Sequence, residues 1–127
     1  MTKVLIIGNN SFIGSNLFSF FKKKFFVQKL SFNDFKKKNI NFLKKFTHII
    51  NCSINPNYSK YKYRGKFDND LIIAKKIKNF KIKYIFLSSR KIYKPKFDIK
   101  ETDTPYPSCS YSKNKLITEK KLNSILN

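Results

Sequence analysis

The sequence predicts an α/β domain built on a doubly wound parallel sheet. Two observations support this fold class: short apolar segments occur along the chain, and the segments between them have apolar residues at helical spacing. Strands that alternate with helices pair in parallel through right-handed crossovers, so helices should cover both faces of the sheet. The expected strands cover residues 3–7, 25–30, 47–53 and 83–88, and the expected helices cover residues 12–23, 33–46, 67–78 and 111–126.

The first half of the chain carries the clearest periodicity. Residues 3–7 read KVLII and end at Gly8, which is typical of a buried parallel strand. Apolar residues fall at helical spacing in residues 12–23, and residues 25–30 form a second apolar strand. Residues 33–46 are rich in Lys and Asn, and their few Phe and Leu residues support only a weak helix.

The middle of the chain continues the alternation. The third strand, residues 47–53, reads THIINCS, and the polar and aromatic residues 55–66 that follow it predict a surface loop. The helix at residues 67–78 has Asp68 or Asn69 as its N-cap, because a side-chain oxygen there can accept a free N–H group of the first turn.

The last part of the chain supplies a strand, a loop and a helix. Residues 83–88, KYIFLS, form the fourth strand, and residues 94–110 hold three of the four prolines and predict a loop. The helix at residues 111–126 closes a single domain, residues 1–127, because a chain of 127 residues has room for one core.

The formal charge of +21 has two interpretations. A basic surface can bind nucleic acid or acidic membranes. However, the lysines are scattered along the chain, and Arg, whose planar fork suits phosphate, occurs only at positions 64 and 90. Lys, Ile, Phe and Asn share A/T-rich codons, which favours compositional drift. We therefore expect no specific nucleic-acid partner, and a basic nucleic-acid-binding module remains an alternative.

The remaining composition indicates a cytoplasmic protein without a metal. Cys52 and Cys109 lie far apart, and together with the single His48 they give no metal-ligand spacing and no disulfide framework. The N-terminal apolar run is only four residues long, Val4 to Ile7, which is too short for a signal peptide or a membrane span. We expect no membrane partner.

The segment GNNSFIG follows the first strand directly and opens a helix, which is the setting of a dinucleotide-binding turn. Gly8 permits a tight turn, Gly14 permits close packing of helix on strand, and the free N–H groups of the helix start can face a pyrophosphate. Ser11 stands at the usual middle glycine and can add a hydroxyl donor. The candidate cofactor-binding residues here are Gly8, Asn10, Ser11, Phe12, Ile13 and Gly14.

Two further features lie where parallel strands present ligands. Ser88 and Ser89 end the fourth strand, where a hydroxyl can hold a substrate oxygen or cap the next turn. Tyr111 and Lys115 are four residues apart at the start of the last helix, so both should lie on one helix face. A cation beside a phenol favours the phenolate and lowers the pKa of the Tyr, which can then exchange a proton with an alcohol or carbonyl.

These features, in this order, resemble the extended short-chain dehydrogenase/reductases, the NAD-dependent epimerase/dehydratase family that acts on sugar nucleotides. The similar segments, which span nearly the whole chain, are KVLIIGNNSFIGSNL, THIINCS, FDNDLIIAKKI, YIFLSSRKIY and ETDTPYPSCSYSKNKLITEKKL. The resemblance implies a Rossmann-like domain that binds NAD or NADP and, with a substrate lobe, a sugar nucleotide.

The resemblance also implies roles for individual residues. Tyr111 moves the hydroxyl proton, Lys115 lowers the pKa of Tyr111 and holds the nicotinamide ribose, and Ser89 hydrogen-bonds the reacting oxygen. Cys52 and Ser53 are expected near the nicotinamide ribose, and Asn69 opens the helix that lines the cofactor. Tyr111 and Lys115 thereby serve both catalysis and cofactor binding.

Three departures from the family pattern leave alternatives open. Ser11 replaces a glycine, and no Asp or Glu closes the second strand to hold the adenosine ribose, which leaves NADP open with Lys29 or Lys36 as phosphate partners. The chain ends about a dozen residues after Lys115, so the C-terminal substrate lobe is expected to be absent. The chain is then the N-terminal part of an epimerase, dehydratase or reductase, or a non-catalytic dinucleotide-binding remnant.

Overall fold

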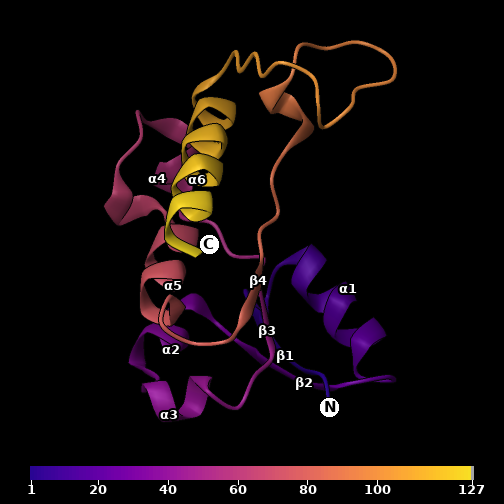
Figure 1. The fold of residues 1–127 in the computed structure, drawn as a ribbon, viewed down its shortest axis with the longest axis vertical. Coiled ribbons are helices and arrows are strands. Elements are labelled where there is room, and N and C mark those ends of the chain that lie inside the picture. Colours follow the sequence, from indigo (N-terminus) through magenta and orange to yellow (C-terminus); the bar gives the residue numbers. More distant parts are fainter. Residues whose placement is uncertain (127) are drawn as a thin grey trace.

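A four-stranded parallel sheet organises the computed structural model, which describes residues 1–126 (Figure 1). The strand order is β2-β1-β3-β4. The chain therefore leaves β1 in one direction to form β2 and returns across β1 to form β3. In such sheets the crevice at the carboxyl ends of the two diverging strands, here β1 and β3, binds ligands. The strands are β1 (Lys3–Ile7), β2 (Phe26–Leu30), β3 (His48–Asn51) and β4 (Lys83–Ile85).

Helices cover the two faces of the sheet unequally. α1 lies alone on one face, whereas α2, α3 and α5 lie on the other, with α6 packed against α5 (Figure 1). The helices are α1 (Phe12–Phe21), α2 (Phe32–Lys37), α3 (Ile40–Leu43), α4 (Pro56–Lys60), α5 (Asn69–Ile77) and α6 (Ser110–Leu126), with 3₁₀ turns η1 (Gly65–Phe67) and η2 (Arg90–Ile92). The predicted doubly wound α/β fold is confirmed.

Alternating residues of the central strands build two hydrophobic clusters. Leu5, Ile7 and Ile49 point toward α2, α3 and α5 and pack there with buried Phe and Ile side chains. Val4, Ile6 and Ile50 point to the opposite face and pack with partly buried residues of α1. Because both faces of these strands are covered, their sequences are continuously apolar and do not alternate.

Two expectations for the helices were wrong. Residues 33–46 do not form one helix, because Ser31 and Asn39 each cap a separate short helix, α2 and α3. Residues 55–66 are not simply a surface loop, since α4 lies within them and Asn55 caps it with Pro56 in its first turn. Tyr58 of α4 is only 4% exposed.

The fourth strand is shorter than expected. β4 ends at Ile85, where pairing with β3 stops, and the chain continues to Ser89 without a strand partner. Ser89 therefore lies beyond the carboxyl edge of the sheet. Asp68 is the N-cap of α5, as expected. Within residues 1–126, no helix combines the length and the apolar character needed to cross a membrane.

Candidate functional site

The turn between β1 and α1 leaves no room for a side chain at either of its glycines. Gly8 has a φ of +99°, and a Cβ there would lie 2.7 Å from the backbone nitrogen of Ser53. A Cβ on Gly14 would overlap the carbonyl oxygen of Gly8. The backbones of β1, α1 and the turn after β3 are therefore in direct contact. Only residues without a Cβ fit at these two positions of the turn.

Ser11 is occupied as the N-cap of α1. Its Oγ accepts a hydrogen bond from the N–H of Gly14 (2.9 Å) and donates one to the carbonyl oxygen of Gly8 (2.9 Å). The hydroxyl is thus used inside the turn, contrary to the expectation that it adds a donor for the pyrophosphate. Phe12 is 85% exposed and Ile13 is also exposed. Their backbone N–H groups lie in the first turn of α1, where the donors have no partner within the helix.

The turn after β3 is held by side chains. Ser53 donates from its Oγ to the Oδ1 of Asn51 (2.6 Å), and Asn69 of α5 donates from its Nδ2 to the Oγ of Ser53 (3.0 Å). Cys52 donates from its backbone nitrogen to the carbonyl oxygen of Ile7 (2.7 Å). Cys52 and Ser53, from the turn after β3, therefore lie next to Gly8, and Asn69 of α5 binds Ser53. Burial, with a smaller effect of Asp70, raises the pKa of the Cys52 thiol.

Two buried carboxylates lie behind this turn, and the sequence reasoning gave neither of them a role in the site. Asp70 accepts hydrogen bonds from the Nδ2 of Asn51 (3.0 Å) and from the hydroxyl of Tyr84 on β4. Asp68 accepts from the hydroxyls of Tyr63 (2.7 Å) and Thr118 (2.7 Å). Burial raises the pKa of Asp70, although the hydrogen bonds and the ammonium of Lys115 act in the opposite direction. The one sequence feature that could have pointed to them is the pair of acidic residues, Asp68 and Asp70, at the start of a predicted helix.

The structure brings Tyr111 and Lys115 together on one face of α6, as predicted. The Nζ of Lys115 lies 5.7 Å from the ring centroid of Tyr111 and 5.6 Å from that of Tyr58. Lys115 is 8% exposed, and its Nζ donates to the carbonyl oxygen of Leu87 (3.0 Å). The ammonium therefore sits among aromatic rings, between α6 and the segment that follows β4.

The expected lowering of the Tyr111 pKa is not observed. Burial raises the pKa of Tyr111, and the negative charges of Asp70 and Cys109 raise it further. Burial also lowers the pKa of Lys115, while Asp70 and Asp68 oppose that shift. The main cause is the desolvation of the phenol, since Lys115 donates to the carbonyl oxygen of Leu87 and, among the described residues, forms no hydrogen bond with Tyr111.

Ser89 caps a turn in this structure. Its Oγ accepts a hydrogen bond from the N–H of Lys91 (3.1 Å) at the start of η2. The neighbouring Ser88 donates to the Oε2 of Glu119 on α6 (2.9 Å). Ser88, Ser89 and Glu119 line an open hollow of about 580 Å³ whose other lining residues do not include Tyr111 or Lys115. Among residues 1–126, no hydrogen bond joins Ser89 to Tyr111 or Lys115.

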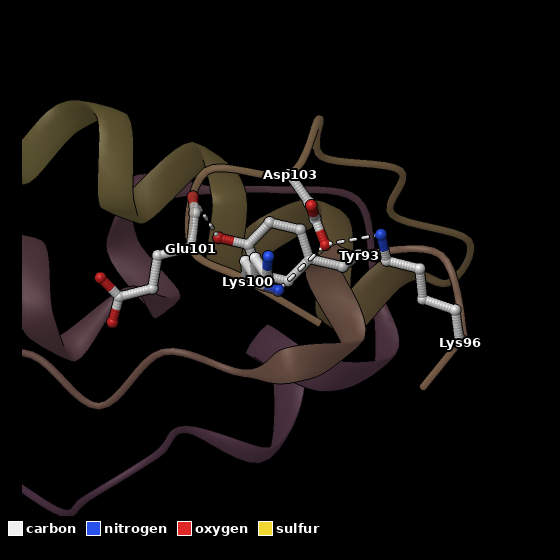
Figure 2. Close-up of polar contacts among 5 residues, drawn as sticks. All are labelled: Tyr93, Lys96, Lys100, Glu101 and Asp103. Carbon is white, nitrogen blue, oxygen red and sulfur yellow. Dashed lines mark hydrogen bonds and ion pairs between the residues drawn. The ribbon is translucent and has the colours of Figure 1, made fainter. Parts of the chain in front are cut away.

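The loop that links η2 to α6 is organised by a small polar cluster (Figure 2). Asp103 forms an ion pair with the Nζ of Lys96 (3.0 Å) and accepts from the backbone N–H of Lys100 (2.9 Å). Tyr93 donates from its hydroxyl to the carbonyl oxygen of Glu101 (3.3 Å), and the Glu101 carboxylate points away from the cluster (Figure 2). These contacts stabilise the loop that connects Ser89 to Tyr111 and Lys115 along the chain.

A second hollow lies at the carboxyl ends of β2 and β3. It has a volume of about 330 Å³ and combines apolar side chains with lysines and small polar groups. Its lining residues are Ser31, Phe32, Asn33, Lys36, Ser53, Ile54, Asn55, Pro56, Lys66, Asn69 and Ile72. It adjoins the glycine turn through Ser53. In the described part of the chain, no three His, Cys, Asp or Glu residues gather as metal ligands.

Comparison with solved structures defines the fold first. The chain covers 98% of its length on a dTDP-4-dehydrorhamnose reductase from Clostridium acetobutylicum, with a TM-score of 0.78 and 22% identity. It covers 97% of its length on the UDP-N-acetylglucosamine 4-epimerase from Methanobrevibacter ruminantium M1 in complex with UDP-N-acetylmuramic acid, with a TM-score of 0.75 and 20% identity. Such a likeness establishes a Rossmann-like fold.

A third structure, MoeE5 in complex with UDP-glucose and NAD, matches 97% of the chain with a TM-score of 0.73 and 16% identity. The chain spans about half the length of these structures: 50% of the reductase, 50% of the epimerase and 48% of MoeE5. No protein-family model matches the sequence, and a sequence search of curated proteins gives no match. The likeness to solved structures agrees with the parallel sheet of order β2-β1-β3-β4 described above.

Proposed function

We propose that this chain is the dinucleotide-binding half of an extended short-chain dehydrogenase/reductase that acts on a sugar nucleotide. One observation carries the proposal: the glycine turn follows β1, the Ser53–Asn69 turn follows β3, and Lys115 of α6 binds the carbonyl oxygen of Leu87 in the segment that follows β4. The turn at Gly8 and Gly14 fits a dinucleotide, because its backbone has no space for a side chain. The solved structures with this fold include enzymes with UDP-glucose and NAD bound.

The residues of this chain have distinct parts in the proposed activity. The first-turn N–H groups of Phe12 and Ile13 hold the pyrophosphate, and Lys115 holds the nicotinamide ribose. A bound nicotinamide supplies hydride transfer at a sugar carbon. Tyr111 gives or takes the hydroxyl proton of the substrate, and Ser89 donates a hydrogen bond to the reacting oxygen.

Completion of the site requires two rearrangements relative to this structure. Lys115 leaves the carbonyl of Leu87 for the ribose, and Ser89 exchanges its capping bond with Lys91 for the substrate oxygen. Glu119 faces Ser88 within hydrogen-bonding distance, so it helps to position that segment. The part of the enzyme that grips the sugar must come from outside residues 1–127, because the relatives of this fold are about twice as long.

A second candidate function is dinucleotide binding without turnover. It is favoured by the capping role of Ser89, whose Oγ accepts a hydrogen bond from the N–H of Lys91. Both candidates share the cofactor site and differ only in whether Ser89 and Tyr111 converge on a substrate.

Nuclear magnetic resonance of the uniformly ¹⁵N-labelled chain tests the shared part of the proposal. Titration with NAD and NADP in about 0.15 M salt, the physiological ionic strength, should shift the amide signals of residues 8–14, Cys52, Ser53 and Asn69. Signals of the distant residues 94–100 serve as the internal control. Shifts spread over lysine-rich segments, or no saturable shifts, would contradict dinucleotide binding at this edge.

A further inference from the structure

We propose that the end of α1 and the chain that leads into β2 form a docking surface for a phospholipid bilayer that carries acidic lipids. The surface lies on the face of the sheet that α1 alone covers (Figure 1). We call it the aromatic–lysine patch, and it consists of Phe18, Phe20, Phe21, Lys22, Lys24, Phe25 and Lys29. The inference goes beyond the proposed function and does not depend on it, because no residue of the patch belongs to the dinucleotide site.

Three rings of the patch form a row across the end of α1. The ring centroids of Phe20 and Phe21 are 5.7 Å apart, and those of Phe21 and Phe25 are 5.9 Å apart. Phe21 packs against the hydrophobic cluster beneath α1, whereas Phe20 is 56% exposed and Phe25 is also exposed. Large apolar side chains that gather on a surface, and do not lie singly, indicate a contact with a partner or a membrane.

Lysines surround these rings. The Nζ of Lys24 lies 5.0 Å from the ring centroid of Phe20. The Nζ atoms of Lys22 and Lys29 lie 5.8 and 4.6 Å from the ring centroid of Phe18. None of the three lysines forms an ion pair within residues 1–126. Lys29, which the sequence leaves open as a phosphate partner of NADP, thus lies against α1 and does not line the hollow at the carboxyl ends of β2 and β3.

The charge of this part of the chain selects an acidic partner. Residues 1–33 contain five lysines and no Asp or Glu, and the first acidic residue of the chain is Asp34. A second copy of the chain at this surface would place lysines against lysines, which costs free energy. A surface with negative charge instead gives each free ammonium group a partner.

The mixture of rings and lysines fits a bilayer better than a nucleic acid. At a membrane interface, Phe side chains enter the boundary of the acyl chains while Lys side chains reach the acidic headgroups. A nucleic-acid base needs an open ring face to stack on, whereas the rings of Phe18 and Phe20 have lysine Nζ atoms over them. The expectation of no membrane partner rested on the lack of a long apolar run, and side chains gathered from a helix and a turn need no such run.

The patch lies away from the dinucleotide site. Lys3 and Phe26 are the first pair of the β1–β2 ladder, so residues 22–25 precede the amino ends of the strands, whereas Gly8 follows the carboxyl end of β1. Figure 1 shows the turn after α1 at the other end of the molecule from the loop that leads into α6. A chain that binds a bilayer through the patch therefore keeps the crevice at the carboxyl ends of the strands open to water.

A single introduced tryptophan tests the contact directly, because the natural chain contains none. Phe20→Trp places an indole in the patch, and Phe97→Trp places one on the exposed loop before α6 as the control. Each variant is mixed at about 0.15 M salt with vesicles of phosphatidylcholine, alone or with about 30% phosphatidylserine. With the acidic vesicles, the emission of Phe20→Trp should shift to shorter wavelength and be quenched by lipids brominated on their acyl chains. The emission of Phe97→Trp should change little.

Sedimentation with the same vesicles separates the patch from the general attraction of a chain with a charge of +21. The double variant Lys22→Gln with Lys24→Gln is compared with Lys113→Gln with Lys120→Gln, which removes the same charge from exposed positions of α6. The patch variant should lose at least about tenfold in affinity for the acidic vesicles, and the control at most about twofold. Both pairs are exposed, and a normal thermal melt shows that neither loss comes from unfolding.

Insertion of the Phe20→Trp indole together with a selective loss in the Lys22 and Lys24 variant supports the inference. Equal losses in the two lysine variants, or quenching of Phe97→Trp in place of Phe20→Trp, would overturn it, because the attraction would then come from overall charge or from another surface. Tight binding of single-stranded RNA that the patch variant loses, without insertion of Phe20→Trp into vesicles, would overturn it in favour of a nucleic acid. Dinucleotide binding is measured separately by calorimetry with NAD and stands or falls independently of these results.

Discussion

Lys115 on α6 donates a hydrogen bond to the carbonyl oxygen of Leu87, two residues before Ser89, over 3.0 Å. This bond joins α6, which carries Tyr111, to the segment after β4, which carries Ser89. Ser89 nevertheless lines a hollow that Tyr111 does not line. The same lysine is surrounded by the rings of Tyr58, Phe86 and Tyr111. Lys115 therefore binds a backbone carbonyl, and the pKa of Tyr111 is raised where a lysine paired with the phenol would lower it.

The phenol of Tyr111 should titrate above its usual pKa of about 10 in the ligand-free chain, because burial and the charges of Asp70 and Cys109 disfavour the phenolate. The ¹³Cζ resonance of Tyr111, assigned by comparison with Tyr111→Phe, follows this titration directly. A midpoint for Tyr111 below about 10, the usual value for a phenol, would show that Lys115 controls the ionisation.

Replacement of Asp70 by Asn should stabilise the fold increasingly as the pH rises from about 4 to 8. Burial raises the folded pKa of Asp70 above its unfolded value of 3.8, so the folded state holds this proton more tightly. The resulting stabilisation is complete below the unfolded pKa and is lost as the pH rises through the folded pKa. Asn keeps an oxygen that can accept from Tyr84 and Asn51.

Urea unfolding of both proteins at several pH values measures this difference. The exposed Asp34→Asn is the matched control, since it removes the same charge from the surface of the chain. A constant free-energy difference between the natural chain and Asp70→Asn across the range would contradict a raised pKa of Asp70.

Tyr58→Phe should lower the free energy of unfolding by about 1 to 2 kcal/mol. The hydroxyl of Tyr58 and the Oγ of Thr118 are 2.7 Å apart in a buried position, and Thr118 donates in turn to Asp68. Loss of the hydroxyl leaves this network without one of its partners. Tyr61→Phe is the control because Tyr61 is 58% exposed. Equal stabilities of the two variants in urea unfolding would mean that the network does not support the fold.

The chain should bind single-stranded RNA weakly, because counterion release favours binding to any polycation. For the same reason the affinity should fall steeply between about 50 and 200 mM salt. The interleaved tyrosines and lysines of residues 58–64 are the best candidates for base stacking. Tyr58 is buried, which leaves Tyr61 as the exposed ring to test. Tyr61→Ala should not change RNA affinity at physiological salt. Tight binding that this variant abolishes would support the nucleic-acid alternative.

The elements that a local pattern specifies were predictable from the sequence. β1, α1 and α5 follow their apolar periodicity and caps, and Gly8 and Gly14 stand where the chain has no space for Cβ atoms. α4 was missed because a buried tyrosine in a polar segment has no periodicity. Its place is determined by a distant contact, the Nδ2 of Asn114 with the carbonyl oxygens of Tyr58 (2.7 Å) and Tyr61 (2.8 Å).

In the site, too, the features set by a local pattern were predictable and those set by distant contacts were not. The shared face of Tyr111 and Lys115 follows from a spacing of four residues in a helix, and spacing does not depend on the rest of the fold. The ionisation of Tyr111 depends on its burial and on Asp70, which approaches from another helix. Asp70 itself is bound to Tyr84 of β4 and Asn51 of β3, and such convergence of separate strands leaves no mark in a single sequence.

Calorimetry of Gly14→Val with NAD and NADP tests the central claim most directly, since a side chain at this position would overlap the carbonyl oxygen of Gly8 and push α1 away from the turn. The account predicts that the natural chain and the control Ser19→Val, an exposed substitution on the same helix, bind cofactor alike. Gly14→Val should show no saturable heat. Ser11→Ala, which removes the cap on the Gly14 N–H, should weaken binding while the chain stays folded by circular dichroism. Unchanged affinity in a folded Gly14→Val, together with unchanged affinity in Ser11→Ala, would contradict a dinucleotide site at this turn.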